Sequence, residues 1–124
     1  MGNPFVHVEL NTTDLGAAKT FYSQLFDWSL EEMPMGPAGS YTMIKVGEGH
    51  GVGGGMMTHP VPGAPSMWLA YVFVPDVHAA TEKARGLGAQ ILREPLEIAG
   101  AGWLSIISDP TGAVLGFWQP TGQM

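Results

Sequence analysis

The segment Phe5-Val6-His7-Val8-Glu9-Leu10-Asn11 decides how the rest of the chain is arranged. Its residues alternate between apolar and polar, which is typical of a strand with one face toward a core. Val8 and its apolar neighbours share one face, and His7, Glu9 and Asn11 share the other. Thr12-Thr13-Asp14-Leu15 follows at once and predicts the start of a helix. We therefore expect a sheet that packs a helix on one side and lines a wet concavity with the other.

The composition limits the kind of protein this can be. The chain has 124 residues, which suits a single domain, and 45% of them are hydrophobic. The net charge is −6 with only five Lys and Arg residues, which argues against binding to nucleic acid or to an anionic membrane surface. The absence of cysteine excludes disulfides, thiolate metal sites and thiol catalysis. Because the sequence has neither a signal-like N-terminus nor an apolar run of membrane-spanning length, we expect a cytoplasmic protein.

Hydrophobic periodicity predicts the same order of elements twice. In the first half, a helix at 14–28 follows the opening strand, and strands at 29–33, 40–46 and 52–58 come next. In the second half, a strand at 67–74 precedes a helix that begins at Asp76, and strands follow at 90–94, 103–108 and 113–119. Asp109-Pro110-Thr111-Gly112 is a strong turn signal between the last two strands.

The two halves are related by an offset of 62 positions. This offset pairs helix starts, helix ends and late strand positions: Asp14 with Asp76, Leu25 with Leu87, Ile44 with Ile106, and Gly54 with Gly116. We interpret the pattern as an internal repeat of two βαβββ units, at 1–60 and 66–120 of a single domain that covers 1–124. The proline-rich segment 59–65 joins the two halves.

The layout resembles the vicinal oxygen chelate superfamily, which includes glyoxalase I, extradiol dioxygenases, and fosfomycin- and bleomycin-resistance proteins. The resemblance rests on His7 placed seven residues before the helix-opening Asp14, on the Phe21-Tyr22…Leu25-Phe26 helix, and on the turn that begins at Asp109. It implies an α+β fold in which two tandem βαβββ units form an open, incomplete barrel around a cavity. It also implies a homodimer, for which the apolar strands 68–74 and 115–118 are plausible interface parts.

Enzymes of that superfamily bind a divalent metal through four strand side chains, and the resemblance gives the corresponding positions here. His7 matches the first ligand, the second falls near Gly54 or Gly55, and the third and fourth fall on Leu69 and Gly116. Glycine and leucine side chains have no lone pair, so these cannot be conservative ligand exchanges. We expect no metal cofactor. The alternative is a divalent metal held by His7 with relocated ligands, namely Glu9 and either His50 or His59.

The other polar residues also have two interpretations. His7 and Glu9 are candidate catalytic residues, as a general acid–base pair in which the carboxylate raises the pKa of the imidazole. They are otherwise a hydrogen-bonded pair that only makes the pocket polar. His78 falls in the first turn of a helix, and we expect it to be solvated.

The repeat register predicts which residues share the face of His7 and line the cavity. The predicted ligand-binding residues are His7, Glu9, Tyr41, Gly54, Met56, Leu69, Tyr71, Trp103, Gly116 and Trp118. Such a cavity favours an apolar or planar aromatic ligand with one polar end, unless the aromatic side chains only fill the barrel as core.

Three functions therefore stay open. The favoured one is a metal-free small-molecule binding protein of the bleomycin-resistance type. The alternative is a metal-dependent lyase, isomerase or dioxygenase of the glyoxalase kind that uses His7, and the third is metal-free acid–base catalysis. Whether the protein is an enzyme is not decided by the sequence.

Overall fold

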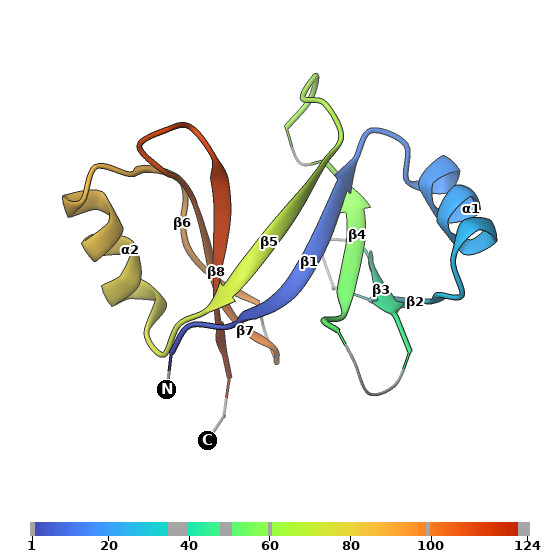
Figure 1. The fold of residues 1–124 in the computed structure, drawn as a ribbon, viewed down its shortest axis with the longest axis horizontal. Coiled ribbons are helices and arrows are strands. Elements are labelled where there is room, and N and C mark those ends of the chain that lie inside the picture. Colours follow the sequence, from blue (N-terminus) through green and yellow to red (C-terminus); the bar gives the residue numbers. More distant parts are fainter. Residues whose placement is uncertain (1, 35–39, 48–50, 60, 99, 122–124) are drawn as a thin grey trace. The chain divides into compact units, whose positions relative to one another are not determined.

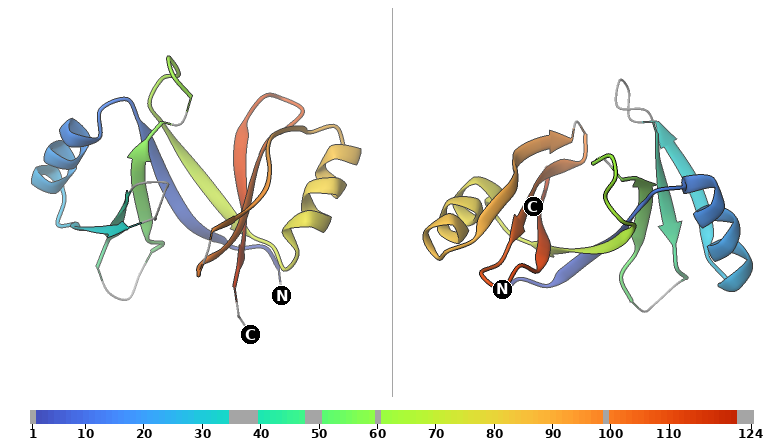
Figure 2. Two further views of the ribbon diagram at one scale, coloured as in Figure 1. Left: turned by 180° about the vertical axis from the view of Figure 1, so that it is seen from behind. Right: turned by 90° about the horizontal axis from the view of Figure 1, so that it is seen from above.

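The structure is a computed structural model that describes residues 2–34, 40–47, 51–59, 61–98 and 100–121. The chain forms two compact units. The N-terminal unit consists of His7–Leu69, and the C-terminal unit consists of Met1–Val6 with Ala70–Met124. Figure 1 shows the elements of both units, and Figure 2 shows them from behind and from above.

The first half of the chain forms a four-stranded sheet with one helix. Its elements are β1 (Phe5–Thr12), α1 (Leu15–Leu25), β2 (Ser29–Pro34), β3 (Ser40–Lys45) and β4 (Gly54–Thr58). The strand order is β2-β3-β4-β1. The parallel pair is β1 with β4, and the other neighbours are antiparallel.

The second half repeats this arrangement. Its elements are β5 (Met67–Phe73), α2 (Val77–Gly86), β6 (Gln90–Ile98), β7 (Gly102–Ser108) and β8 (Val114–Pro120). The strand order is β5-β8-β7-β6, and β5 is parallel to β8 while the other neighbours are antiparallel. The predicted α+β class and the two βαβββ units are confirmed.

Matching caps start the two helices. The Asp14 carboxylate accepts a hydrogen bond from the backbone N–H of Ala17 at 3.0 Å, and Asp76 accepts one from Ala79 at 3.1 Å. Each bond satisfies one of the N–H groups that a helix start leaves without a helical partner. The first helix ends at Leu25, three residues before the predicted end. No helix among the described residues is long and apolar enough to cross a membrane.

The predicted turn at Asp109 is also present. One carboxylate oxygen of Asp109 accepts hydrogen bonds from the N–H and hydroxyl of Thr111 and from the N–H of Ala113, at 2.7–3.0 Å. These bonds lower the pKa of Asp109 below its usual value, because they favour the charged form. The turn connects β7 to β8 directly.

In the N-terminal unit, the core lies between α1 and the sheet. Leu10, Ile44 and Met56 are buried there, and Met56 has no exposed surface. The partly buried residues that pack against them are Leu15, Ala18, Tyr22, Trp28, Leu30 and Val46. No residue of α1 itself is fully buried, and Phe21 and Leu25 are more than half exposed.

In the C-terminal unit, α2 packs on its sheet partly through a buried polar pair. The hydroxyl of Thr81 donates to the carbonyl of Val77 at 2.7 Å and lies 2.8 Å from the hydroxyl of Ser105 on β7. Val77, Thr81 and Ser105 have no exposed surface. The buried hydroxyls are thus satisfied by one another and by the helix backbone.

Candidate functional site

A polar cluster lies on the face of the N-terminal sheet that points away from α1. It consists of His7, Glu9 and Asn11 on β1 and Tyr41 on β3. The Tyr41 hydroxyl donates to one carboxylate oxygen of Glu9 at 2.9 Å, and the Asn11 amide donates to the other at 2.9 Å. Nε2 of His7 lies 2.8 Å from the Tyr41 hydroxyl oxygen. Two of the predicted ligand-binding residues, His7 and Glu9, are therefore linked through a third, Tyr41.

Gly55 makes this link possible. β4 lies between β3 and β1, and Gly55 on β4 is the register partner of Glu9. A Cβ atom at position 55 would overlap the hydroxyl and ring atoms of Tyr41. Because glycine has none, the Tyr41 ring crosses over β4 and its hydroxyl reaches Glu9 on the next strand but one.

The hydrogen bonds also indicate the tautomer of His7. Because the single proton of the Tyr41 hydroxyl is donated to Glu9, the bond between His7 and Tyr41 must carry a proton from Nε2 of His7. Burial lowers the pKa of His7 below its ordinary value of 6.5, and the negative charge of Glu9 opposes this shift only in part. The Glu9 carboxylate does raise the pKa of His7, as predicted, but the loss of hydration on burial outweighs this attraction, so the net pKa is lowered.

Two of the predicted ligand-binding residues of the N-terminal unit lie on the opposite face of the sheet, the one toward α1. Met56 packs against Leu10 and Ile44 beneath α1, and Gly54 is the register partner of Ile44 on that side. A Cβ atom at Gly54 would overlap the backbone carbonyl of Val8, so this glycine allows β4 to approach β1 closely. The placement of Gly54 and Met56 on the face of His7 is wrong, and Gly55 occupies that face instead.

In the C-terminal unit, most of the predicted ligand-binding residues lie on the sheet face that points away from α2. Tyr71 lies against Gly116, its register partner, and Trp118 follows Gly116 on the same face by strand alternation. Leu69, the last residue of the N-terminal unit, lies on the same face of β5 as Tyr71 by the same alternation and is 2% exposed. Whether these residues bind a ligand stays a prediction.

Trp103 is the exception. Its ring lies 4.9 Å from that of His78 on α2, and Ser105, two residues along β7, contacts the same helix. Trp103 therefore faces the helix, and its predicted position on the ligand face is wrong. His78 is exposed, as expected, but it also contacts an aromatic ring.

These face errors have one cause. Equivalent residues of the two halves are 62 positions apart in the first strand and the helix, which pairs β1 with β5 and α1 with α2. In the later strands, residues on equivalent faces of the sheet are 61 positions apart. Gly55 and Gly116 are the equivalent pair, because both lie on the face away from their helix with a tyrosine ring against them. Register irregularities in β6, between Ile91 and Arg93 and between Arg93 and Leu96, accompany this change.

The described side chains form no set of ligands for a metal ion of the kind that the resemblance implies. No group of three or more His, Cys, Asp or Glu residues in the described part of the chain is arranged to hold one. His59, a predicted relocated ligand, accepts a hydrogen bond at Nδ1 from the N–H of Val61 at 3.0 Å. His50, the other, lies outside the described residues.

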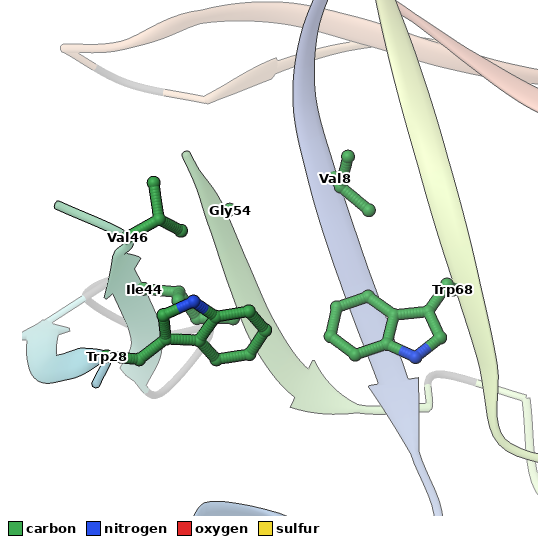
Figure 3. A pocket seen from close by; sticks show the side chains of 6 residues that line it. All are labelled: Val8, Trp28, Ile44, Val46, Gly54 and Trp68. Carbon is green, nitrogen blue, oxygen red and sulfur yellow. The ribbon is translucent and has the colours of Figure 1, made fainter. Parts of the chain in front are cut away.

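An apolar pocket lies on the helix-facing side of the N-terminal unit. It has a volume of about 290 Å³ and is lined by Val8, Trp28, Ile44, Val46, Gly54 and Trp68. Figure 3 shows the rings of Trp28 and Trp68, whose centroids are 6.4 Å apart. No lining side chain other than the two indoles carries a polar atom, so the pocket offers little to orient a ligand. The polar cluster is the stronger candidate site.

Comparison with known proteins was made at the level of family, sequence and fold. A family model described as Glyoxalase/Bleomycin resistance protein/Dioxygenase superfamily matches residues 5–117. A protein of Mycobacterium tuberculosis named "Putative glyoxylase CFP32" is 40% identical over 114 residues, which cover 90% of this chain and 44% of that protein. The anthracycline biosynthesis protein DnrV of Streptomyces peucetius is 25% identical over 126 residues, which cover 90% and 45% respectively. The chain thus spans less than half the length of these relatives.

Solved structures support the fold. Methylmalonyl-CoA epimerase from Mycobacterium tuberculosis superposes with a TM-score of 0.69 and 17% sequence identity, over 94% of this chain and 87% of the epimerase. At this level of identity, the likeness concerns the fold alone. It confirms the predicted glyoxalase-like fold.

Proposed function

The chain belongs to the glyoxalase/bleomycin resistance protein/dioxygenase superfamily, and on this premise we propose that it is a metal-free small-molecule binding protein. The ligand is apolar or aromatic with one polar end, and that end contacts the cluster of His7, Tyr41 and Glu9. The hydrogen-bonded chain through Tyr41 is the observation that supports this proposal. It holds an imidazole, a phenol and a carboxylate in direct hydrogen-bonded contact at one place on the sheet.

The chemistry of the cluster suits recognition of a polar group at the end of an apolar molecule. Glu9 and Asn11 are only 7% and 5% exposed, and their mutual hydrogen bond holds the carboxylate in one orientation. Rigid, partly dehydrated polar groups give specificity, because a ligand that fails to match them leaves them without hydrogen-bond partners. DnrV is named for anthracycline biosynthesis, which makes polycyclic aromatic compounds a reasonable ligand class to test first.

Ligand titration with and without chelator tests the proposal. A thermal-shift screen of aromatic carboxylic acids and anthracycline aglycones selects a ligand, and calorimetry then measures its affinity for EDTA-treated and untreated protein. We expect equal affinities. Glu9→Gln should weaken binding at least tenfold because it removes the charge that orients Tyr41, whereas the control Glu97→Gln, at an exposed position on β6, should not.

The opposite result would favour the metal-dependent alternative. If binding is lost with EDTA, and elemental analysis finds one equivalent of metal that disappears in His7→Ala, the protein is a metal-dependent member of the superfamily. A measurable reaction in EDTA-treated protein that depends on His7 and Glu9 would instead support acid–base catalysis.

The proposal includes a homodimer. Phe21, Leu25, Phe26 and Trp68 of the N-terminal unit are between 41% and 56% exposed, and exposed apolar groups of this size often mark an interface. Light scattering after gel filtration should give twice the chain mass for the wild type. Phe21→Ser with Leu25→Ser should give the monomer, while the control Leu87→Ser, at a residue 71% exposed on the other unit, should not. A monomeric wild type would contradict this part.

A further inference from the structure

Two glycines stand where the superfamily's enzymes carry metal ligands, and each has a tyrosine ring against it. The resemblance places ligand positions on the fourth strand of each βαβββ unit. The faces of the strands identify these positions as Gly55 on β4 and Gly116 on β8. The surroundings of these glycines decide whether a ligand side chain could be accommodated there.

In the N-terminal unit, the space for a side chain at position 55 is already filled. A Cβ atom on Gly55 would overlap three atoms of the Tyr41 phenol, including its hydroxyl oxygen. The ring cannot simply rotate away, because its hydroxyl is bonded to Glu9 at 2.9 Å and to His7 at 2.8 Å. A carboxylate at position 55 would therefore have to break both hydrogen bonds before it could reach an ion.

The C-terminal unit shows the same arrangement independently. A Cβ atom on Gly116 would lie 2.5 Å from Cδ2 and Cε2 of Tyr71, closer than real Cβ atoms approach, and 3.0 Å from its Cγ. Tyr71 is 4% exposed, so its ring has little room to move. The equivalent position of each repeat thus has a glycine covered by tyrosine, although the two tyrosines come from different strands, β3 and β5.

The surviving ligand position is also altered. Nε2 of His7 lies 2.8 Å from the Tyr41 hydroxyl oxygen, so this nitrogen is already engaged in a hydrogen bond. The position related to His7 by the repeat is Leu69, which is 2% exposed and apolar.

From these contacts we infer that Tyr41 and Tyr71 replace the metal-binding carboxylates of the superfamily, each filling the side-chain space of a glycine in its own unit. Tyr41 is in addition a specificity-determining residue, because it converts the ion-binding position into part of a hydrogen-bonding surface for an organic ligand. That last step rests on the proposed function, whereas the replacement itself does not.

Double-mutant cycles test the replacement without any ligand. Gly55→Ala should lower the folding equilibrium constant about tenfold or more, measured by urea unfolding, because it displaces Tyr41 from two hydrogen bonds. The matched control Gly53→Ala, whose Cβ would meet its nearest atom at an ordinary 3.7 Å, should have little effect. In a Tyr41→Ala background, the additional effect of Gly55→Ala should fall to that of the control.

The C-terminal unit provides a second cycle. Gly116→Ala should be strongly destabilising, or unfold the protein, in the wild-type background and much less so with Tyr71→Ala. Gly86→Ala, which has open space around its Cβ, is the control. The inference would be overturned if Gly55→Ala and Gly53→Ala reduced the folding stability equally. It would also be overturned if Gly55→Ala reduced the stability as much in the Tyr41→Ala background as in the wild type.

Metal titration gives a third, separate measurement. Calorimetry with Zn²⁺ should show no binding to the wild type or to Gly55→Glu alone. The double variant Gly55→Glu with Tyr41→Ala should bind Zn²⁺ at least tenfold more tightly than the wild type does. Adding His7→Ala should remove that gain in affinity. Stoichiometric, His7-dependent binding of Zn²⁺ to the wild type would overturn the inference. A failure to find an organic ligand would count against the proposed function alone.

Discussion

Replacing Tyr41 with phenylalanine removes one oxygen atom from the centre of the polar cluster and leaves the ring in place. The ring still covers Gly55, so the packing of β3 across β4 is retained. What is lost is the bond to the Glu9 carboxylate at 2.9 Å and the contact with Nε2 of His7 at 2.8 Å. The change therefore isolates the contribution of the hydroxyl.

The size of the effect follows from the burial of the two partners. A hydrogen bond to a charged group contributes about 1.5–3 kcal/mol, and a bond between neutral groups contributes about 1 kcal/mol. Glu9 is 7% exposed but keeps its bond from Asn11, so the carboxylate is not left without a donor. We therefore expect a loss of about 2 kcal/mol in the free energy of unfolding, which corresponds to a fall of roughly 6–10 °C in Tm for a domain of this size.

Urea unfolding followed by tryptophan fluorescence measures this change as a shift in midpoint at constant slope. Tyr22→Phe is the control, because the hydroxyl of Tyr22 forms no hydrogen bond with another residue in the described part of the chain. It should change the free energy of unfolding by less than about 0.5 kcal/mol. If Tyr41→Phe costs no more than Tyr22→Phe, the hydroxyl does not hold the cluster together.

Three further predictions concern the N-terminal unit. Met56→Ala should cost about 2–5 kcal/mol in urea unfolding, because Met56 has no exposed surface, and a cost below 1 kcal/mol would contradict its place in the core. Thr42→Val should be neutral or stabilise by about 1 kcal/mol, because the Thr42 hydroxyl is buried without a hydrogen-bond partner among the described residues; a clear loss would indicate a hidden partner. NMR titration should place the pKa of His7 below 6.5, and Glu9→Gln should lower it further by removing the opposing charge. Because the folded state then binds fewer protons than the unfolded one, His7 should make stability fall as the pH drops from the unfolded pKa to the folded pKa, and a rise over this range would refute the assignment.

Local signals in the sequence predict much of this fold. Asp14 and Asp76 cap their helices, and Asp109 organises its turn, because each carboxylate acts on backbone groups only a few residues away. The alternation in β1 likewise places His7 and Glu9 on one face. These predictions need no knowledge of distant contacts.

The errors arise where a face depends on the register between strands. Gly54, Met56 and Trp103 were assigned to a face by carrying one offset through the whole repeat, and a shift of one residue reverses every side chain of a strand. The irregular pairing of β6 includes Pro95, whose missing N–H is typical of edge strands and bulges, but this residue does not tell which face the following strands present. The bridge by Tyr41 could have been suspected only from the run Gly53-Gly54-Gly55, which leaves room for a large neighbour.

The four tryptophans are divided equally between the two units, which gives each unit its own optical reporter. Trp28 and Trp68 belong to the N-terminal unit, and Trp103 and Trp118 belong to the C-terminal unit. The indoles of Trp28 and Trp68 are inclined by 74°, close enough for their electronic transitions to couple and to give a circular dichroism signal of their own. Replacing either pair by phenylalanine would therefore leave tryptophan fluorescence from one unit only, so that the unfolding of that half of the duplicated chain could be followed by itself.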